Sequence, residues 1–215
     1  MSQLLSIIKY NFKHNALPGI LLTIAILLFT PVIFGITAQD MQASAYPLEI
    51  ALPFIGVVLL TSIFSTENDV SILDTVRSKE IPYIFVCILR IIISFIFITV
   101  SILGFVILMS ILECEVTGIH ALASIANAIF LGGLGILGSA ITNNIVIGYM
   151  IPVLYYVVDM MGGIEKFTLF SMMREGIIKD KLMFFIFGII FIILSIIIKQ
   201  IKLKGINIKG RLKNS

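Results

Sequence analysis

Few side chains in this chain of 215 residues have the chemical character of a catalytic or metal site. His14 precedes the first long apolar run and His120 begins the fourth, so they fall at opposite ends of the helices predicted below and cannot share a metal. The sequence contains no H-E-x-x-H motif and no phosphate-binding G-x-x-x-x-G-K-[ST] pattern. Ser139 follows Gly138 but has neither a nucleophile motif nor a histidine on a nearby segment. We therefore expect no active site, metal or cofactor in this chain.

Asp159 is the acid that lies deepest in an apolar run, and it stands close to Tyr155 and Tyr156. An ionisable residue inside a membrane segment indicates a functional site, because burying a charge in lipid is unfavourable. Asp159 also precedes the end of its segment at Gly162-Gly163 by only three residues. In that position an acid is commonly an interfacial residue held by a hydroxyl. The sequence supports both interpretations.

The polar segment 65–82 stands between two long apolar runs. Thr66 and Asp69 have the spacing of a capping box, with Asp in place of the usual Glu or Gln. Apolar residues then recur at three-residue steps, at Val70, Leu73 and Val76. This pattern predicts a short amphipathic helix. Because no catalytic residues lie nearby, the helix suggests a membrane subunit on which another protein acts.

The composition is typical of a polytopic membrane protein. Hydrophobic residues make up 59% of the chain and charged residues 13%, with a mean hydropathy of +1.13, whereas soluble domains carry about 45–50% and about 25%. A helix needs roughly 20 apolar residues to cross a bilayer core of about 30 Å. Six segments qualify: 17–37, 46–64, 83–112, 119–141, 145–162 and 182–198. We predict an all-α fold in which residues 1–215 form a single transmembrane domain.

The distribution of basic residues predicts the orientation of these six spans. With both termini in the cytoplasm, eleven of the 15 basic residues face inward and four face outward. An excess of Lys and Arg on the cytoplasmic side is the general rule, and the opposite topology would invert it. The four external basic residues are Lys166, Arg174, Lys179 and Lys181. Both termini are therefore expected in the cytoplasm.

The two ends of the chain have patterns suited to a membrane surface. Residues 1–16 place Leu4, Leu5, Ile8 and Phe12 on one side of a predicted interfacial helix. This helix is either a surface anchor or an elbow that docks the protein driving a transporter. The basic tail 199–215 directly follows a span, so attraction to anionic lipid headgroups, at about 1 kcal/mol per basic residue, explains it more simply than nucleic acid does.

The external segment 163–181 is rich in large apolar residues, at Phe167, Leu169, Phe170, Met172 and Met173. Such a segment would not stay in water, and we expect it to lie along the outer leaflet or dip into it. It is either an ordinary amphipathic linker or an outer gate. A gate would use Phe167, Phe170, Met172 and Met173 to contact an amphiphilic substrate.

Small residues accumulate in the fourth apolar run, at Gly132, Gly133, Gly135, Gly138 and Ser139. Small side chains let helices approach closely in a membrane, where lipid gives no hydrophobic reward for packing. The surface they form could pack against other helices of the same subunit or against a second copy. The sequence leaves these two alternatives open.

The order of these parts resembles the transmembrane subunit of type-two ABC exporters, the ABC-2-type transporter family. The resemblance covers nearly the whole chain, from the surface helix before the first span to the long external excursion between spans five and six. It includes Glu67 before a short helix at 71–78, and a small-residue span ending Gly138-Ser139-Ala140-Ile141-Thr142-Asn143-Asn144. The family's E-x-G-T pattern is reduced here to Glu67-Asn68-Asp69-Val70, without the glycine. The short chain fits small bacterial export or self-immunity systems.

The resemblance implies a permease subunit in a bacterial plasma membrane that forms the export path for an amphiphilic substrate such as a peptide, a lipid-like molecule or a drug. A separate cytoplasmic P-loop ATPase would bind ATP and Mg and push on a coupling helix at 69–79. A second permease, identical or similar, would complete the complex. The implied coupling residues are Glu67, Asp69, Val70, Leu73, Val76 and Arg77. The alternative is a membrane immunity or scaffold protein that acts without an ATPase.

Overall fold

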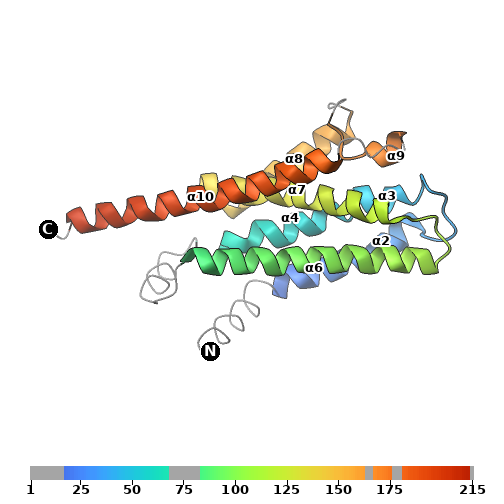
Figure 1. Cartoon of the computed structure of the whole chain (residues 1–215), viewed down its shortest axis with the longest axis horizontal. Coiled ribbons are helices and arrows are strands. Elements are labelled where there is room, and N and C mark those ends of the chain that lie inside the picture. The colour runs from blue at the N-terminus through green and yellow to red at the C-terminus, as the bar shows by residue number, and fades with distance from the viewer. Residues whose placement is uncertain (1–16, 68–82, 163–166, 176–180, 214–215) are drawn as a thin grey trace.

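The computed structural model describes residues 17–67, 83–162, 167–175 and 181–213. These residues form helices and connecting turns (Figure 1), with no strand in the described ranges. In chain order the helices are α2 (Leu17–Phe34), α3 (Ala45–Ile50), α4 (Pro53–Thr61), the 3-10 helix η2 (Ser62–Glu67), α6 (Tyr83–Ile111), α7 (Gly118–Thr142), α8 (Ile145–Met160), α9 (Ser171–Glu175) and α10 (Lys181–Lys213). The predicted all-helical class is confirmed.

Among the described residues, five helical stretches are long and apolar enough to cross a membrane: Leu17–Phe34, Ala45–Phe64, Phe85–Ile111, Gly118–Thr142 and Lys181–Lys202. The protein is therefore a multi-pass membrane protein. The sixth predicted span, 145–162, forms α8, which has only 16 residues. At 1.5 Å per residue this helix is roughly 24 Å long, less than the bilayer core of about 30 Å. In the described part of the chain the structure thus shows five apolar helical stretches of at least 18 residues and one shorter apolar helix.

The connections between helices gather at two ends of the bundle. One end, here called the α9 end, contains the chain from Gly35 to Ser44, the link between α6 and α7, and α9 (Figure 1). Main-chain hydrogen bonds join these links, from Ala38 N–H to the Leu112 carbonyl (3.0 Å) and from Glu115 N–H to the Gln39 carbonyl (2.9 Å). The opposite end, the Asn143 end, contains η2, the start of α6 and the tight turn between α7 and α8.

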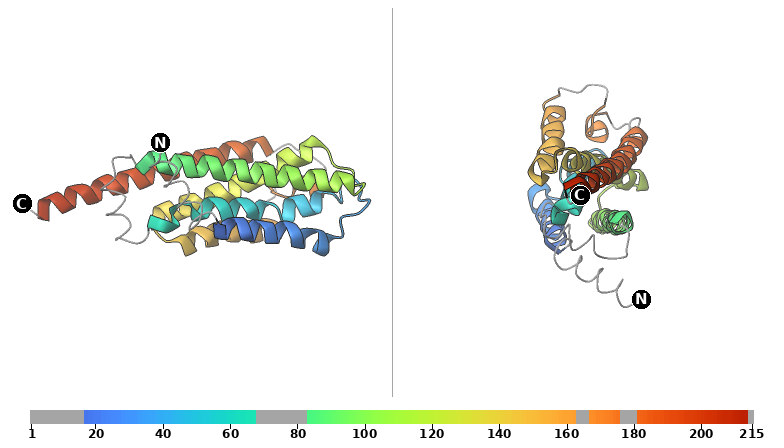
Figure 2. Two further views of the ribbon diagram at one scale, coloured as in Figure 1. Left: turned by 90° about the horizontal axis from the view of Figure 1, so that it is seen from below. Right: turned by 90° about the vertical axis from the view of Figure 1, so that its left-hand side faces the viewer.

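Helix α7 lies at the centre of the bundle. In its apolar stretch 83% of the residues are buried, and in the stretch formed by α3, α4 and η2 the share is 78%. The corresponding shares in α2, α6 and α10 are 17%, 22% and 28%. The end-on view in Figure 2 shows α2, α6, α8 and α10 arranged around α4 and α7. Two helices therefore form the interior, and the others present apolar residues to lipid.

Glycines allow three helices to contact α7 closely. A Cβ added at Gly56 of α4 would lie 1.9 Å from the Ala128 carbonyl oxygen, closer than any real contact. At Gly188 of α10 it would lie 2.8 Å from the main chain of Ile129, and at Gly148 of α8 2.9 Å from the Gly135 carbonyl. Close contact of this kind stabilises helix pairs through van der Waals packing.

The small residues singled out in the sequence face neighbouring helices of the same chain. Gly132 lies against Gly56 and Leu60 of α4, Gly135 lies against Thr61 and Gly148, and Gly138 lies against Ile151 of α8. Ser139 is buried and donates its hydroxyl hydrogen to the Ile136 carbonyl within α7. The structure thus uses these residues for packing inside one subunit, rather than presenting them to a second copy.

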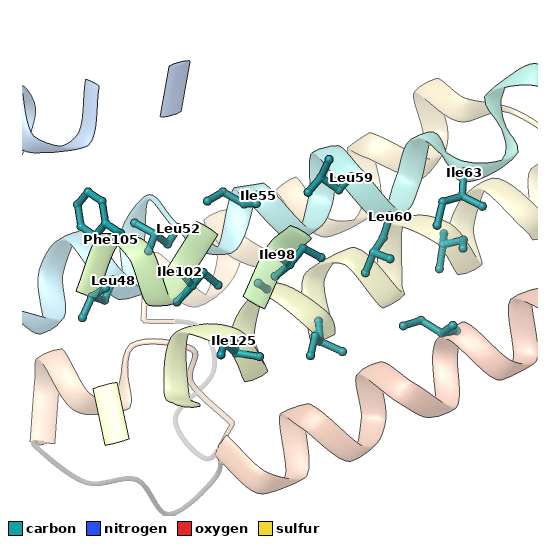
Figure 3. Close-up of a cluster of buried hydrophobic side chains, with 14 of the residues drawn as sticks. Leu48, Leu52, Ile55, Leu59, Leu60, Ile63, Ile98, Ile102, Phe105 and Ile125 are labelled. Atoms are coloured by element: carbon teal, nitrogen blue, oxygen red, sulfur yellow. The ribbon is translucent and has the colours of Figure 1, made fainter. Parts of the chain in front are cut away.

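A large hydrophobic cluster fills the space between α3, α4, α6 and α7 (Figure 3). The close-up labels Leu48, Leu52, Ile55, Leu59, Leu60 and Ile63 from the α3–α4–η2 stretch, opposite Ile98, Ile102 and Phe105 of α6 and Ile125 of α7. All are buried. The cluster holds α6 against the interior pair even though only 22% of the apolar stretch of α6 is buried.

Candidate functional site

Polar side chains from four helices converge inside the protein at the α9 end. They are Glu49 of α3, Asn127 of α7, Asp159 of α8 and Lys181 of α10, and each is at most 3% exposed. We call these four residues the polar cluster. Burial of a charge is unfavourable unless it is paired and hydrogen-bonded. Each of these four side chains is accordingly hydrogen-bonded or ion-paired inside the protein.

Glu49 and Lys181 form a buried ion pair with a separation of 2.6 Å between Oε1 and Nζ. The carboxylate also accepts main-chain hydrogen bonds from α9, with Met172 N–H at 3.2 Å from Oε1 and Met173 N–H at 2.9 Å from Oε2. Glu49 therefore caps the first turn of α9, where main-chain N–H groups have no partner within the helix. One carboxylate thus connects α3, α9 and α10.

Lys181 and Asn127 together bind one carbonyl group, that of Leu169. The Asn127 amide donates to it at 2.9 Å, and the Lys181 ammonium also donates to it. Lys181 donates in addition to the Asn127 side-chain oxygen at 3.2 Å. The Leu169 carbonyl therefore receives donors from α7 and α10 at once.

Asp159 binds the other polar main-chain group of Leu169. Its Oδ2 accepts from Leu169 N–H at 2.6 Å, while its Oδ1 has no hydrogen-bond partner in the described part of the chain. Arg174 donates to the carbonyls of Asp159 (3.0 Å) and Met160 (3.3 Å), where a cation is favourable at the C-terminus of α8. Asp159 is thus fully buried near the end of α8 and is held by a main-chain N–H group.

The apolar side chains of residues 167–175 are largely covered by protein rather than by lipid. Leu169 and Phe170 are 0% exposed, Met172 is 4% exposed and Met173 is half-buried, whereas Phe167 is 41% exposed. The ring of Phe170 contacts that of Tyr156 at a centroid distance of 5.2 Å. The expectation that this segment lies in the outer leaflet is therefore wrong for its central residues, because the bundle itself provides their apolar surroundings.

The polar cluster holds a segment of main chain. Its hydrogen bonds go to the N–H and carbonyl groups of Leu169 and to the N–H groups of Met172 and Met173. Two tyrosines add similar contacts, from Tyr155 to the Phe167 carbonyl (3.0 Å) and from Tyr156 to the Ile50 carbonyl (3.2 Å). In the described ranges no group of three His, Cys, Asp or Glu side chains could hold a metal ion.

A second set of polar contacts lies at the Asn143 end and involves cations. Arg90 donates to the Ile63 carbonyl at 2.9 Å, and Lys202 donates to the Ala140 carbonyl at 2.9 Å. The ammonium of Lys199 lies 5.3 Å from the ring centre of Phe64 and 3.5 Å from the side-chain oxygen of Asn143. Cations near the last carbonyls of a helix are favourable. These side chains connect α6 and α10 to the interior helices.

The predicted coupling helix lies outside the described residues. Asp69, Val70, Leu73, Val76 and Arg77 belong to 68–82, and the main chain of Glu67 ends η2. The surface helix at 1–16 also lies outside. The structure does define where the coupling segment attaches, because η2 and the start of α6 both lie at the Asn143 end (Figure 1).

Sequence reasoning missed the role of Glu49, Asn127 and Lys181. A usable signal was present, since each is a strongly polar residue at the edge or interior of an apolar run. Glu49 lies inside the predicted span 46–64 and Lys181 directly precedes the predicted span 182–198, and an acid and a base in such positions suggest a buried pair. The sequence gives no indication of which acid pairs with which base, because Glu49 and Lys181 are distant in the chain.

Two substitutions of Asp159 test whether the stability of the protein depends on the charge of this carboxylate or on the oxygen that accepts from Leu169 N–H. Asp159→Asn keeps an oxygen that can accept from Leu169 N–H and removes an incompletely hydrogen-bonded buried charge. Asp159→Leu leaves that N–H without an acceptor, which costs about 1–3 kcal/mol. We expect thermal unfolding of the purified protein in detergent to show little change in stability for Asp159→Asn and a clear loss of stability for Asp159→Leu. Equal losses would mean that the charge itself is required.

Comparison with known proteins assigns this chain to no family. No family model, no curated protein and no solved structure matches the chain.

Proposed function

We propose that this chain is the permease subunit of an ATP-driven exporter in a bacterial plasma membrane, powered by a separate P-loop ATPase. The observation that carries this proposal is the attachment of segment 68–82 at the Asn143 end. This amphipathic sequence lies between η2 and α6 in the chain. Lys199 and Lys202 lie at the same end of the bundle. A short helix is marginal alone in water, so its apolar side needs a protein partner.

The orientation that we propose places the Asn143 end in the cytoplasm. Basic residues favour that side, and the tail of α10 carries many of them. Helix α8 begins at Ile145, directly after its N-cap Asn144, and ends at Met160 at the α9 end, so it returns the chain along the bundle. A short crossing helix can be accommodated by local thinning of the bilayer. Under this proposal the chain crosses six times and both termini are cytoplasmic.

The transport path in this proposal ends at the α9 end. Phe167, Phe170, Met172 and Met173 lie there, and they are the residues that we propose as an outer gate or a contact for an amphiphilic substrate. A second permease, identical or similar, would complete the path, and lipids would cover the exposed apolar faces of α2, α6 and α10. ATP and Mg would be bound only by the partner ATPase.

Cysteine labelling in intact cells tests the orientation. Native Cys87 and Cys114 are first replaced by alanine, and single cysteines are then introduced at Glu115, exposed at the α9 end, and at Lys209 in α10. We expect a membrane-impermeant maleimide to label Glu115→Cys and to spare Lys209→Cys until the cells are opened. The reverse pattern would contradict the proposed topology.

Co-purification tests the ATPase partner. The wild-type chain alone is expected to hydrolyse no ATP, and extraction in mild detergent should bring down a soluble P-loop ATPase. Leu73→Asp should weaken that association at least about 30-fold, because loss of one buried apolar contact costs about 2–5 kcal/mol.

Thr75→Asp is the matched control, because a predicted helix places residue 75 on the side opposite Leu73. It introduces the same charge in the same segment and should retain the ATPase. If Leu73→Asp also retains wild-type amounts, the coupling assignment is wrong. If no ATPase accompanies even the wild-type chain, the alternative of an immunity or scaffold protein is favoured.

A further inference from the structure

The polar cluster holds residues 167–175 through main-chain groups. Leu169 is bound at both its N–H and its carbonyl, and the first turn of α9 is bound at two N–H groups. The side chains of Leu169 and Phe170 are buried in the same place. The segment is thus bound much as a separate peptide would be, by polar contacts along the chain and by apolar side chains beside them.

The two partners of the ion pair belong to elements that both extend to the Asn143 end. Glu49 lies on α3, which continues through α4 and η2 to Glu67, the attachment point of segment 68–82. Lys181 begins α10, whose Lys199 lies against Phe64 at that far end. A displacement of α3 and α4 relative to α10 along the bundle would therefore change the separation of Glu49 and Lys181.

Partial opening of this cluster is unfavourable. If Lys181 moved away while the segment stayed in place, Glu49 would remain buried without its counter-ion. If the segment left while the pair stayed buried, the Leu169 and α9 groups would exchange their partners for water and the cluster would retain unsatisfied atoms. The contacts are therefore made together or lost together, which defines two discrete arrangements rather than a gradual movement.

We propose that Glu49 and Lys181 are positioning residues that hold residues 167–175 as a releasable closure of the α9 end, and that displacement of α3–α4 releases it. This inference rests on the proposed transport function, because it assigns the closure to the exit of the path. Asn127 and Asp159 also bind this segment, at the carbonyl and at the N–H group of Leu169. The amphiphilic substrate leaves when the segment is released.

Cysteine accessibility reports directly on the closure. Ser171 is a suitable position, because its side chain is 4% exposed and its Oγ has no hydrogen-bond partner in the described ranges, so Ser171→Cys disturbs no such contact. In a Cys87→Ala/Cys114→Ala background reconstituted in lipid nanodiscs, we expect slow maleimide labelling at rest. Labelling should become at least tenfold faster during ATP turnover with the co-purified ATPase.

Exchanging the charges of Glu49 and Lys181 distinguishes a closure of the α9 end from an ion pair that acts alone. Lys181→Met should make labelling of Ser171→Cys fast with or without ATP. Glu49→Lys/Lys181→Glu restores an ion pair but places a cation against the N–H groups of α9 and a carboxylate against the Leu169 carbonyl. The swap should therefore also label fast. If it instead returns to slow labelling, the pair acts alone and the proposal is overturned.

Two further readouts separate the possible failures. A parallel set of variants keeps native Cys87, which is 1% exposed, and we expect it to stay unlabelled, showing that the fold persists. Slow labelling of Ser171→Cys in the Lys181→Met protein would overturn the closure, whatever the ATPase does. If Lys181→Met opens the segment but no ATPase drives the wild type, the positioning role stands and the transport proposal fails. If ATP hydrolysis by the co-purified ATPase leaves the labelling rate of Ser171→Cys unchanged, the proposed release of residues 167–175 is overturned.

Discussion

Gly56→Ala is expected to be among the most destabilising single methyl additions to this protein. The added Cβ would lie 1.9 Å from the Ala128 carbonyl oxygen and 2.5 Å from its carbonyl carbon. Main-chain atoms cannot rotate away as a side chain can, so α4 and α7 would have to separate. Overpacking typically costs about 1–3 kcal/mol, and we expect about 3 kcal/mol or more here. Thermal unfolding of the detergent-solubilised protein measures the loss.

Gly104→Ala provides the matched control. It makes the same substitution within α6, where no atom lies within 4 Å of the added Cβ. Alanine is favoured over glycine in a helix by roughly 0.5–1 kcal/mol, so this variant should be as stable as the wild type or slightly more stable. If both variants unfold at the same temperature, the contact between α4 and α7 does not depend on Gly56.

Lys181→Met is expected to lower stability by about 3–5 kcal/mol, the usual effect of removing one partner of a buried ion pair. The substitution keeps an unbranched side chain of similar length but leaves the Glu49 carboxylate buried without its counter-ion. In the double variant Glu49→Gln/Lys181→Met no uncompensated charge remains, and one amide oxygen can still accept from α9. We expect the double variant to recover more than half of the loss.

A double-mutant cycle on thermal unfolding measures this coupling between the two side chains. Lys202→Met is the matched control, because Lys202 caps the last carbonyls of α7 at a less buried position. Its removal should cost about 0.3–1 kcal/mol. Additive losses in the cycle would show that Glu49 and Lys181 contribute separately, and would contradict a shared role.

The limits of most long helices could be predicted because their signals are local. The predicted span 83–112 became Tyr83–Ile111, and 119–141 became Gly118–Thr142. The turn between these predicted spans contains two adjacent asparagines, of which Asn143 adopts the left-handed conformation with φ of 53°. Continuous apolar sequence and residues tolerant of a tight turn determine these features without reference to the rest of the chain.

The candidate site could not be predicted, because it depends on contacts between distant segments. Glu49 belongs to the predicted span 46–64 and Lys181 to the predicted external segment 163–181, and the sequence contains no rule that pairs them. The burial of Leu169 and Phe170 depends on the space left between α7, α8 and α10. The sequence therefore indicated that residues 167–175 are apolar, but it could not distinguish lipid from protein as their surroundings.

Five hydroxyl groups within the spans bond to their own helices, whereas that of Ser124 in α7 donates to the Leu48 carbonyl of α3. Thr23, Thr30, Thr99, Ser139 and Ser195 each donate to a carbonyl three or four residues earlier. A hydroxyl has one hydrogen to donate, so none of these residues retains a donor with which to bind a neighbouring helix. Sliding of one helix along another breaks none of these bonds. These five hydroxyls therefore add no hydrogen bond between helices, and van der Waals contact at glycines such as Gly56 and Gly188 holds the middle of the bundle together.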